Sequence, residues 1–171
     1  LNEFLKIEPE IVNKNTELSV IEGAIAFQNV SYTYEDTNIK ALQDISFTVK
    51  KGETLAILGK TGSGKSTILS LISRLYDVSE GQITVDGTLI KDLNVYDLRN
   101  SIGIVPQDAF LFSDSIKNNI KFGKENATNA EVEAAAKSAV VHDNIIGFNK
   151  KYETILGERG ITLSGGQKQR V

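Results

Sequence analysis

The residues best suited to chemistry in this sequence form the glycine-rich run Gly59-Lys60-Thr61-Gly62-Ser63-Gly64-Lys65-Ser66. Every fixed position of this run, which we call the phosphate loop, fits the pattern G-x-x-x-x-G-K-[ST]. Glycines let the backbone curl until successive N–H groups point inward, and a following helix adds the positive end of its dipole. Lys65 brings a mobile cation to the β- and γ-phosphates, and the Ser66 hydroxyl is suited to ligate Mg²⁺. The run therefore predicts a site for a nucleoside triphosphate.

Two elements must position this loop. Before it, Thr54–Leu58 is a short apolar run that is typical of a strand buried on both faces. After it, a wide apolar stripe predicts a helix over 64–76, formed by Ile68, Leu69, Leu71, Ile72 and Leu75. A plain glycine turn is the alternative, which this context disfavours. By itself the loop fits kinases, GTPases and motor ATPases equally well.

A second glycine-containing run, Leu163-Ser164-Gly165-Gly166-Gln167, lies near the end of the sequence, and we call it the signature loop. Its glycines follow a serine and precede the polar, helix-forming run 167–170. This order predicts a helix N-terminus with exposed N–H groups and a hydroxyl, which is a second element that could bind an anion. A plain helix cap explains this run equally well when it is considered alone.

The two loops together strongly resemble the motifs of ABC-transporter ATPase domains, and the resemblance covers roughly residues 23–171. Tyr34 looks like the aromatic residue that stacks on adenine. Gln107 looks like the Q-loop glutamine, which touches Mg²⁺ or the attacking water. Gly157–Gly160 is similar to a segment that marks exporters, although Ile155 stands where the family often has Glu.

The resemblance implies an α/β fold: a P-loop NTPase with a RecA-like parallel core, an antiparallel β subdomain and an α-helical subdomain. It implies ATP and Mg²⁺ as cofactors, with Lys65 and Gln107 in catalysis and Ser66 and Gln107 at the metal. The residues implied to bind nucleotide are Tyr34, Gly59, Lys60, Thr61, Gly62, Ser63, Gly64, Lys65, Ser66 and Thr67.

The resemblance also implies partners. Two such domains meet head to tail, so that Ser164, Gly165, Gly166 and Gln167 of one subunit close on the ATP of the other. Asn2–Glu10 resembles the linker from a transmembrane domain of the same chain. The implied function is that of an exporter ATPase at the cytoplasmic face of the cell membrane, as in lipid, drug and peptide exporters. A non-transport ABC ATPase and a nucleotide-binding interaction module without turnover are the alternatives.

Several family elements normally lie beyond the signature loop, and this sequence stops at Val171. They are the Walker B strand with its Asp, the catalytic Glu and the switch His. His142 precedes the signature loop, so we expect it to cap or pack a helix. We therefore expect a piece of the fold without its C-terminal part. It should bind ATP without hydrolysing it efficiently, and Thr54–Leu58 should lack a strand neighbour.

Composition excludes several classes of protein. The 171 residues include no Cys and one His, which excludes disulfides and multi-histidine metal sites. No apolar run approaches the roughly 20 residues that span a bilayer, so we expect this piece to be soluble. The net charge of −3 comes from residues 1–22, which hold five Glu and two Lys. The remaining charges cancel, and we expect no nucleic-acid partner.

The pattern along the chain predicts three parts: a linker over 1–22, an α/β nucleotide-binding core with a β subdomain over 23–107, and a helical subdomain with the signature loop over 108–171. Alternation predicts strands over 25–34, with a slip near Asn29-Val30, and over 45–49. Asp86-Gly87 predicts a hairpin, and 102–105 a buried strand. Helices are predicted over 115–121 and 129–141, the second capped by Thr128 or Asn129.

Overall fold

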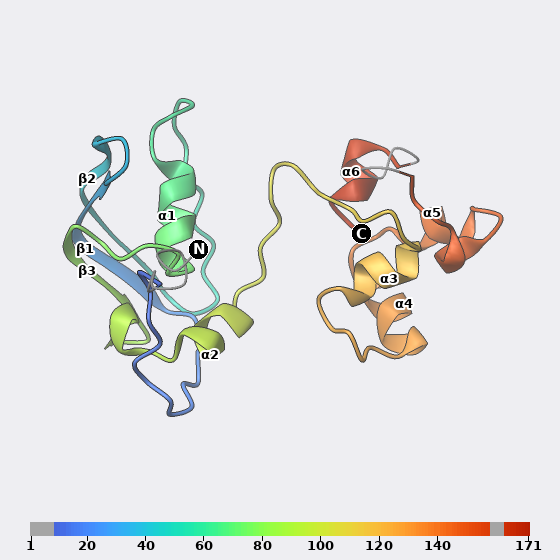
Figure 1. Cartoon of the computed structure of the whole chain (residues 1–171), viewed down its shortest axis with the longest axis horizontal. Helices are drawn as coiled ribbons and strands as arrows, with labels where there is room; N and C mark the ends of the chain where they lie inside the picture. Colours follow the sequence, from blue (N-terminus) through green and yellow to red (C-terminus); the bar gives the residue numbers. More distant parts are fainter. Residues whose placement is uncertain (1–8, 158–162) are drawn as a thin grey trace, which may run out of the picture. The chain divides into compact units, whose positions relative to one another are not determined.

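The computed structural model of this chain describes residues 9–157 and 163–171. The chain forms two compact units, which divide between Gly103 and Ile104. The first unit contains the sheet and α1 (Lys65–Ile72), and the second contains the helices from α3 (Ile116–Lys121) onward (Figure 1). Residues 1–8 of the predicted linker and Glu158–Gly160 of the predicted exporter-like segment lie outside the described residues.

The first unit is built on a four-stranded antiparallel sheet with the strand order β2-β1-β3-β4. Its strands are β1 (Ile25–Tyr34), β2 (Ile39–Val49), β3 (Glu80–Val85) and β4 (Thr88–Leu89). The strand predicted over 25–34 is confirmed, and the register of its pairing with β2 shifts between Phe27 and Val30, where the alternation slips. The predicted hairpin is also confirmed. Asp86 and Gly87 have φ of 52° and 80°, which suits a two-residue turn between twisted strands.

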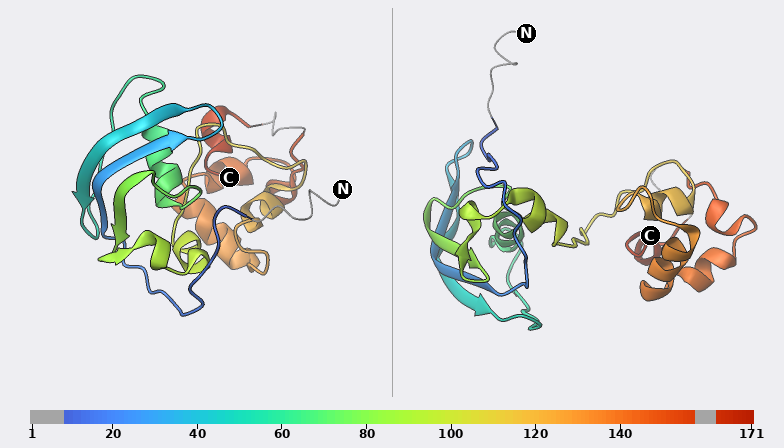
Figure 2. Two further views of the ribbon diagram at one scale, coloured as in Figure 1. Left: turned by 60° about the vertical axis from the view of Figure 1, so that its left-hand side comes forward. Right: turned by 90° about the horizontal axis from the view of Figure 1, so that it is seen from below.

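Helix α1 packs on one face of this sheet (Figure 2). It contributes Ile68 and Leu71 to a buried core that also holds Phe27, Val30, Leu42, Ile83, Val85 and Leu98. The helix is shorter than the predicted span of 64–76. It ends at Ile72 because Arg74 takes a left-handed φ of 48°, which an α-helix does not accommodate.

The predicted parallel strands are not found among the described residues. Neither 54–58 nor 102–105 is a strand in the part of the chain that the structure describes, because a strand needs a neighbour with which to exchange hydrogen bonds. The apolar side chains of the first segment are consequently open: Leu55 is 47% exposed and Leu58 is 93% exposed. The antiparallel and helical parts of the predicted fold are present.

A carboxylate ties the beginning of β1 to the β3–β4 turn. The Asp86 oxygens accept hydrogen bonds from the amides of Glu22 (2.7 Å), Gly23 (3.1 Å) and Ala24 (2.8 Å). Burial raises the pKa of the Asp86 carboxyl, but these three amides and Lys51 lower it by more, so the net shift is downward. Folding therefore favours the ionised form of this side chain.

This downward shift predicts an acid-sensitive contribution to stability. It should be complete above the ordinary carboxyl pKa of about 3.9 and be lost as the pH falls through the lowered value. In Asp86→Asn, the free energy of unfolding in urea should therefore depend less steeply on pH between about 5 and 2 than in the wild type. Asparagine tolerates the left-handed turn, so the hairpin is retained. Parallel pH profiles for the two proteins would contradict this assignment.

The second unit is helical. Its elements are α3 (Ile116–Lys121), α4 (Asn129–Ser138), α5 (His142–Ile146), the 3-10 turn η3 (Lys151–Glu153) and α6 (Gly165–Lys168). The predicted cap of α4 is confirmed at Thr128, whose hydroxyl accepts from the amide of Glu131 while the Glu131 carboxylate accepts from the amide of Thr128. A buried core joins these helices and contains Leu111, Ile116, Ala136, Val141, Ile145, Leu156 and Leu163.

A buried asparagine organises the segment before α3. The Asn119 side chain accepts from the amide of Phe112 (2.7 Å) and donates to the carbonyls of Phe112 (3.1 Å) and Ser115 (3.0 Å). The adjacent Asn118 is exposed, so residue type alone does not distinguish Asn119, and this role was not predicted from the sequence. The amide fixes the path of the chain between Phe112 and Ser115.

Val140 is a strained position in the second unit. This β-branched residue has a left-handed φ of 54° and is 73% exposed. Glycine should remove the steric cost and lose almost no contact, so Val140→Gly is expected to stabilise the unit by about 1 kcal/mol. Ala139→Gly is the control, because Ala139 has φ of −79° and glycine there should not stabilise. Urea unfolding of both variants tests this; an equal response would contradict it.

Candidate nucleotide-binding site

The phosphate loop leads directly into α1 and depends on glycine at two turns. Gly62 and Gly64 have φ of 80° and 83°, which side-chain-bearing residues rarely adopt. A Cβ atom on Gly64 would lie 2.4 Å from the carbonyl oxygen of Ala41 and 2.7 Å from Leu42 Cδ2. The close approach of β2 therefore allows only glycine at position 64.

Helix α1 begins without a side-chain cap. Helices α2 (Val95–Asn100), α3, α4 and α6 each have an N-cap side chain that accepts from the first turn, whereas α5, like α1, has none. Within the described residues no side chain does this for α1, whose N-cap residue is Gly64. The first N–H groups of a helix lack partners within the helix, so those of α1 are available to an anion.

The Lys65 side chain contacts the backbone of the phosphate loop. Its ammonium donates to the carbonyls of Gly59 (2.9 Å) and Lys60 (2.7 Å) and to the Ser63 hydroxyl (3.4 Å). The loop adjoins a hollow of about 240 Å³. Its lining residues are Tyr34, Ile39, Lys40, Ala41, Gly62, Ser63, Gly64, Lys65, Ser66 and Thr67. The structure thus brings together a cation, an uncapped helix N-terminus and a hollow at the predicted phosphate site.

Tyr34 lies beside this loop. Its hydroxyl is 3.1 Å from the hydroxyl of the buried Thr67. Its half-buried ring packs edge-on against Tyr32 (4.9 Å between centroids) and Tyr76 (5.7 Å). Burial raises the pKa of Tyr32 to about 12, with smaller contributions from the neighbouring Tyr76 and Tyr34. The Tyr32 hydroxyl is therefore neutral near pH 7. The position of Tyr34 suits the predicted contact with adenine, which stays a prediction.

The signature loop forms a helix N-terminus, as predicted. Ser164 caps α6: its hydroxyl accepts from the Gln167 amide (3.3 Å), and the Gln167 side chain accepts from the Ser164 amide (2.9 Å). These contacts are those of a capping box. They account for Ser164 and Gln167 within the unit, so a role of this loop toward an anion stays a prediction.

The two glycines of the signature loop are not explained by packing. A Cβ atom on Gly165 or on Gly166 would meet no atom of the described residues within 4 Å. Neither glycine has a positive φ. Glycine also has a lower helix propensity than alanine. The described residues therefore give no packing reason for these glycines, whereas a group that approaches the backbone closely from outside would require them.

Gln107 lies close to α6 in the second unit. Its carbonyl oxygen accepts a hydrogen bond from the Gln169 side chain at 3.1 Å, and the residue is exposed. The structure therefore brings the predicted Q-loop residue and the end of the signature helix together. The proposed contacts of Gln107 with Mg²⁺ and water stay predictions.

His142 has the structural role that we expected. It is the first residue of α5, and its Nδ1 atom lies 2.8 Å from the Tyr152 hydroxyl. Among residues 9–157 and 163–171, no three His, Cys, Asp or Glu side chains gather as metal ligands. Mg²⁺ commonly takes few protein ligands and several phosphate oxygens, and the exposed Ser66 hydroxyl next to Lys65 fits that role.

Comparison with known proteins adds the family to this geometry. The sequence profile described as ABC transporter matches residues 42–171. The chain belongs to the ABC transporter family. This membership accounts for both the phosphate loop and the signature loop, which the profile spans.

Relatives of this ABC transporter chain are much longer than it is. "ATP-binding cassette sub-family B member 6" of Mus musculus is 49% identical over 171 residues, covering 99% of this chain and 20% of that protein. YfiB of Bacillus subtilis, described as an uncharacterized ABC transporter ATP-binding protein, is 46% identical, covering 100% of this chain and 30% of that protein. The chain thus spans less than a third of the length of these relatives.

A solved structure agrees with the fold. "Structure of a bacterial Atm1-family ABC exporter with ATP bound" is similar with a TM-score of 0.86 and 44% sequence identity. The match covers 96% of this chain and 29% of that chain. This match confirms the predicted fold class, an ABC ATPase domain of the P-loop NTPase class. The similar structure is that of an exporter. In the described residues, no helix is both long and apolar enough to cross a membrane.

Proposed function

We propose that this chain is the nucleotide-binding domain of an ABC exporter and that it binds MgATP at Gly59–Thr67. The observation that carries the proposal is that the uncapped N-terminus of α1 and the Lys65 side chain line one hollow. Free N–H groups and a cation converge on one side of a hollow, which suits a chain of phosphates. Tyr34 lines the same hollow and would support adenine, while Ser66 would hold Mg²⁺ against the phosphates.

The proposal includes a second copy of the domain in a head-to-tail pair. Ser164–Gln167 of one copy would close on the γ-phosphate held by the other. The support is that Gly165 and Gly166 are exposed and that no neighbour among the described residues requires glycine at either position. An anion could approach these residues closely because they carry no side chain.

Mixing two defective variants tests this pairing. Lys65→Ala and Ser164→Ala should each weaken ATP-dependent association, measured by sedimentation velocity. An equimolar mixture should recover association, because each mixed head-to-tail pair contains one site with both residues intact. A mixture that associates no better than either variant alone would contradict the head-to-tail arrangement.

In the parent protein we propose that this domain couples ATP binding and hydrolysis to export. The proposed location is the cytoplasmic face of the membrane, beside a transmembrane domain of the same chain. The similarity to an Atm1-family ABC exporter over 96% of this chain supports this assignment. A non-transport ABC ATPase is the weaker alternative, since the similar structure is an exporter.

The 171 residues alone should bind ATP with little turnover. Two of the residues to which the family pattern assigns a role in ATP hydrolysis, Lys65 and Gln107, are present in this sequence. Phosphoryl transfer also needs a group that orients the attacking water. Phosphate release by the purified chain should therefore stay close to that of the Lys65→Ala variant. A rate well above that variant would contradict this proposal.

A further inference from the structure

The segment before β1 is fastened to the N-terminus of α2 by polar contacts. The Asn13 side chain accepts from the Val95 amide (3.0 Å) and donates to Asn94 Oδ1 (3.3 Å). The Ser19 hydroxyl accepts from the Asn94 amide (3.2 Å), and the Ser19 amide donates to the Asp97 carboxylate (2.8 Å). We call residues 13–19 the strap. It supplies hydrogen-bond acceptors to the amides with which α2 begins.

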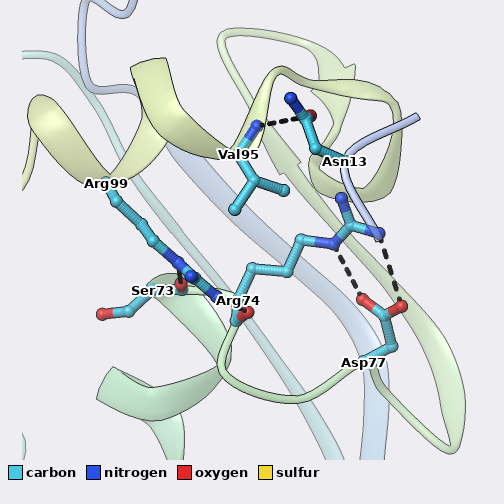
Figure 3. A network of polar contacts seen from close by, with 6 residues as sticks. All are labelled: Asn13, Ser73, Arg74, Asp77, Val95 and Arg99. Atoms are coloured by element: carbon cyan, nitrogen blue, oxygen red, sulfur yellow. Dashed lines mark hydrogen bonds and ion pairs between the residues drawn. The ribbon is translucent and has the colours of Figure 1, made fainter. Parts of the chain in front are cut away.

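The other end of α2 holds the end of α1. The Arg99 guanidinium donates to the carbonyl of Ser73 (3.1 Å) and to that of Arg74 (2.7 Å), as Figure 3 shows. These carbonyls follow the last turn of α1, which carries the negative end of the helix dipole. A cationic donor at this position interacts favourably with the helix end. The strap and the end of α1 are thus joined through the short helix α2.

The turn held by Arg99 is strained. Arg74 has a φ of 48°, and its side chain is only 4% exposed. Its guanidinium pairs with Asp77 at 3.0 Å, but Nη1 has no hydrogen-bond partner among the described residues (Figure 3). A left-handed residue and an unpaired buried donor both cost free energy, so the turn keeps this shape only while its neighbours hold it.

Helix α1 connects this turn to the phosphate loop. Its eight residues span about 12 Å, and Ile68 and Leu71 are buried in the core. A packed helix of this length moves as a unit, so a shift at its C-terminus also moves the N–H groups at its N-terminus. Lys65 and Ser66 are the first two residues of that helix.

We propose that Arg99 is a positioning residue for the nucleotide site, and that the strap controls the site through it. This inference rests on the proposed binding of MgATP at Gly59–Thr67. The strap fixes the position of α2, and Arg99 couples that position to the C-terminal end of α1. The position of α1 in turn determines where its first N–H groups face the phosphates. A displacement of the strap then changes the affinity for MgATP without any contact between strap and nucleotide.

Calorimetric titration of the full chain with MgATP tests the proposal. Asn13→Ala and Arg99→Gln should each raise the Kd, within the range of about 2-fold to 30-fold that such couplings show, and Arg99→Gln by more. The Kd of the double variant Asn13→Ala/Arg99→Gln should lie within about twofold of that of Arg99→Gln alone, because Asn13 acts through Arg99. Arg99→Lys, which keeps a charged donor, should recover part of the affinity.

A structural control separates this account from a loss of stability. Gln82→Ala removes the 2.6 Å contact with Gln28, which involves neither α1 nor α2, and should leave the Kd unchanged. Hydrogen exchange at amides 60–66 should speed up in Asn13→Ala and not in Gln82→Ala. Unchanged affinities in Asn13→Ala and Arg99→Gln, or effects that multiply in the double variant, would overturn the proposal. A wild-type chain that does not bind MgATP would instead contradict the nucleotide site itself.

Discussion

Replacement of Lys65 by alanine is expected to weaken MgATP binding by about 100-fold or more. The ammonium is held at the phosphate loop by the carbonyls of Gly59 and Lys60, and Lys65 lines the hollow in which we propose that the phosphates bind. Hydrogen bonds to charged partners are worth about 1.5–3 kcal/mol each, and 2.7 kcal/mol corresponds to about 100-fold in Kd. Calorimetric titration of wild-type and variant chains measures the difference.

Lys60→Ala is the matched control for this prediction. It removes the same charge from the same loop, but the observed contact of Lys60 with the Lys65 ammonium uses its backbone carbonyl, which alanine retains. We expect a change in Kd of less than about threefold, as for an exposed charge. Equal losses in the two variants would indicate that only the net charge of the loop matters, and would contradict the specific role of Lys65.

Replacement of Gly64 by alanine is expected to affect both stability and binding. The new Cβ would lie 2.4 Å from the Ala41 carbonyl oxygen, and the backbone has φ of 83°. A left-handed residue costs about 1–2 kcal/mol, and an overpacked contact adds about 1–3 kcal/mol. We therefore expect the free energy of unfolding in urea to fall by about 2–5 kcal/mol and MgATP binding to be lost, because α1 must move away from β2.

Gly103→Ala provides the comparison within the first unit. A Cβ there would meet no atom of the described residues within 4 Å, and its φ is not in the left-handed region. This variant should change the free energy of unfolding by less than about 1 kcal/mol. If Gly64→Ala also lowered the free energy of unfolding by less than about 1 kcal/mol, the close packing of β2 against the phosphate loop would be contradicted.

Local patterns were sufficient to predict much of this fold. Alternation predicted β1, with its irregularity after Phe27, and Asp86-Gly87 predicted the hairpin. The capping residues Thr128 and Ser164 marked the starts of α4 and α6. Each of these features depends on residues close together in the chain, which is why sequence alone could identify them.

Features that depend on distant residues could not be predicted in the same way. Thr54–Leu58 was predicted to be a strand that lacks a strand neighbour, but a strand forms only with a hydrogen-bonded partner, so this segment is not a strand among the described residues. Helix α1 ends early at a turn that Arg99 holds from 25 residues away. Asn13 and Ser19 fall within the predicted linker, yet their partners lie 75 to 82 positions later.

The candidate site shows the same contrast between features set by neighbouring residues and features set by distant ones. The phosphate loop could be predicted because one short pattern supplies its glycines, cation and hydroxyl. The missing cap of α1 and the closeness of Tyr34 to Thr67 required the folded chain, since each depends on how β1, β2 and α1 pack.

Titration of the wild-type 171-residue chain with MgATP tests the central claim most directly. We predict saturable binding at one site per chain, with the affinity lost in Lys65→Ala. Such a result would establish that the phosphate loop and the uncapped end of α1 form a nucleotide site in this chain. Heats that stay at the level of dilution up to millimolar MgATP, in a chain shown to be folded, would contradict it.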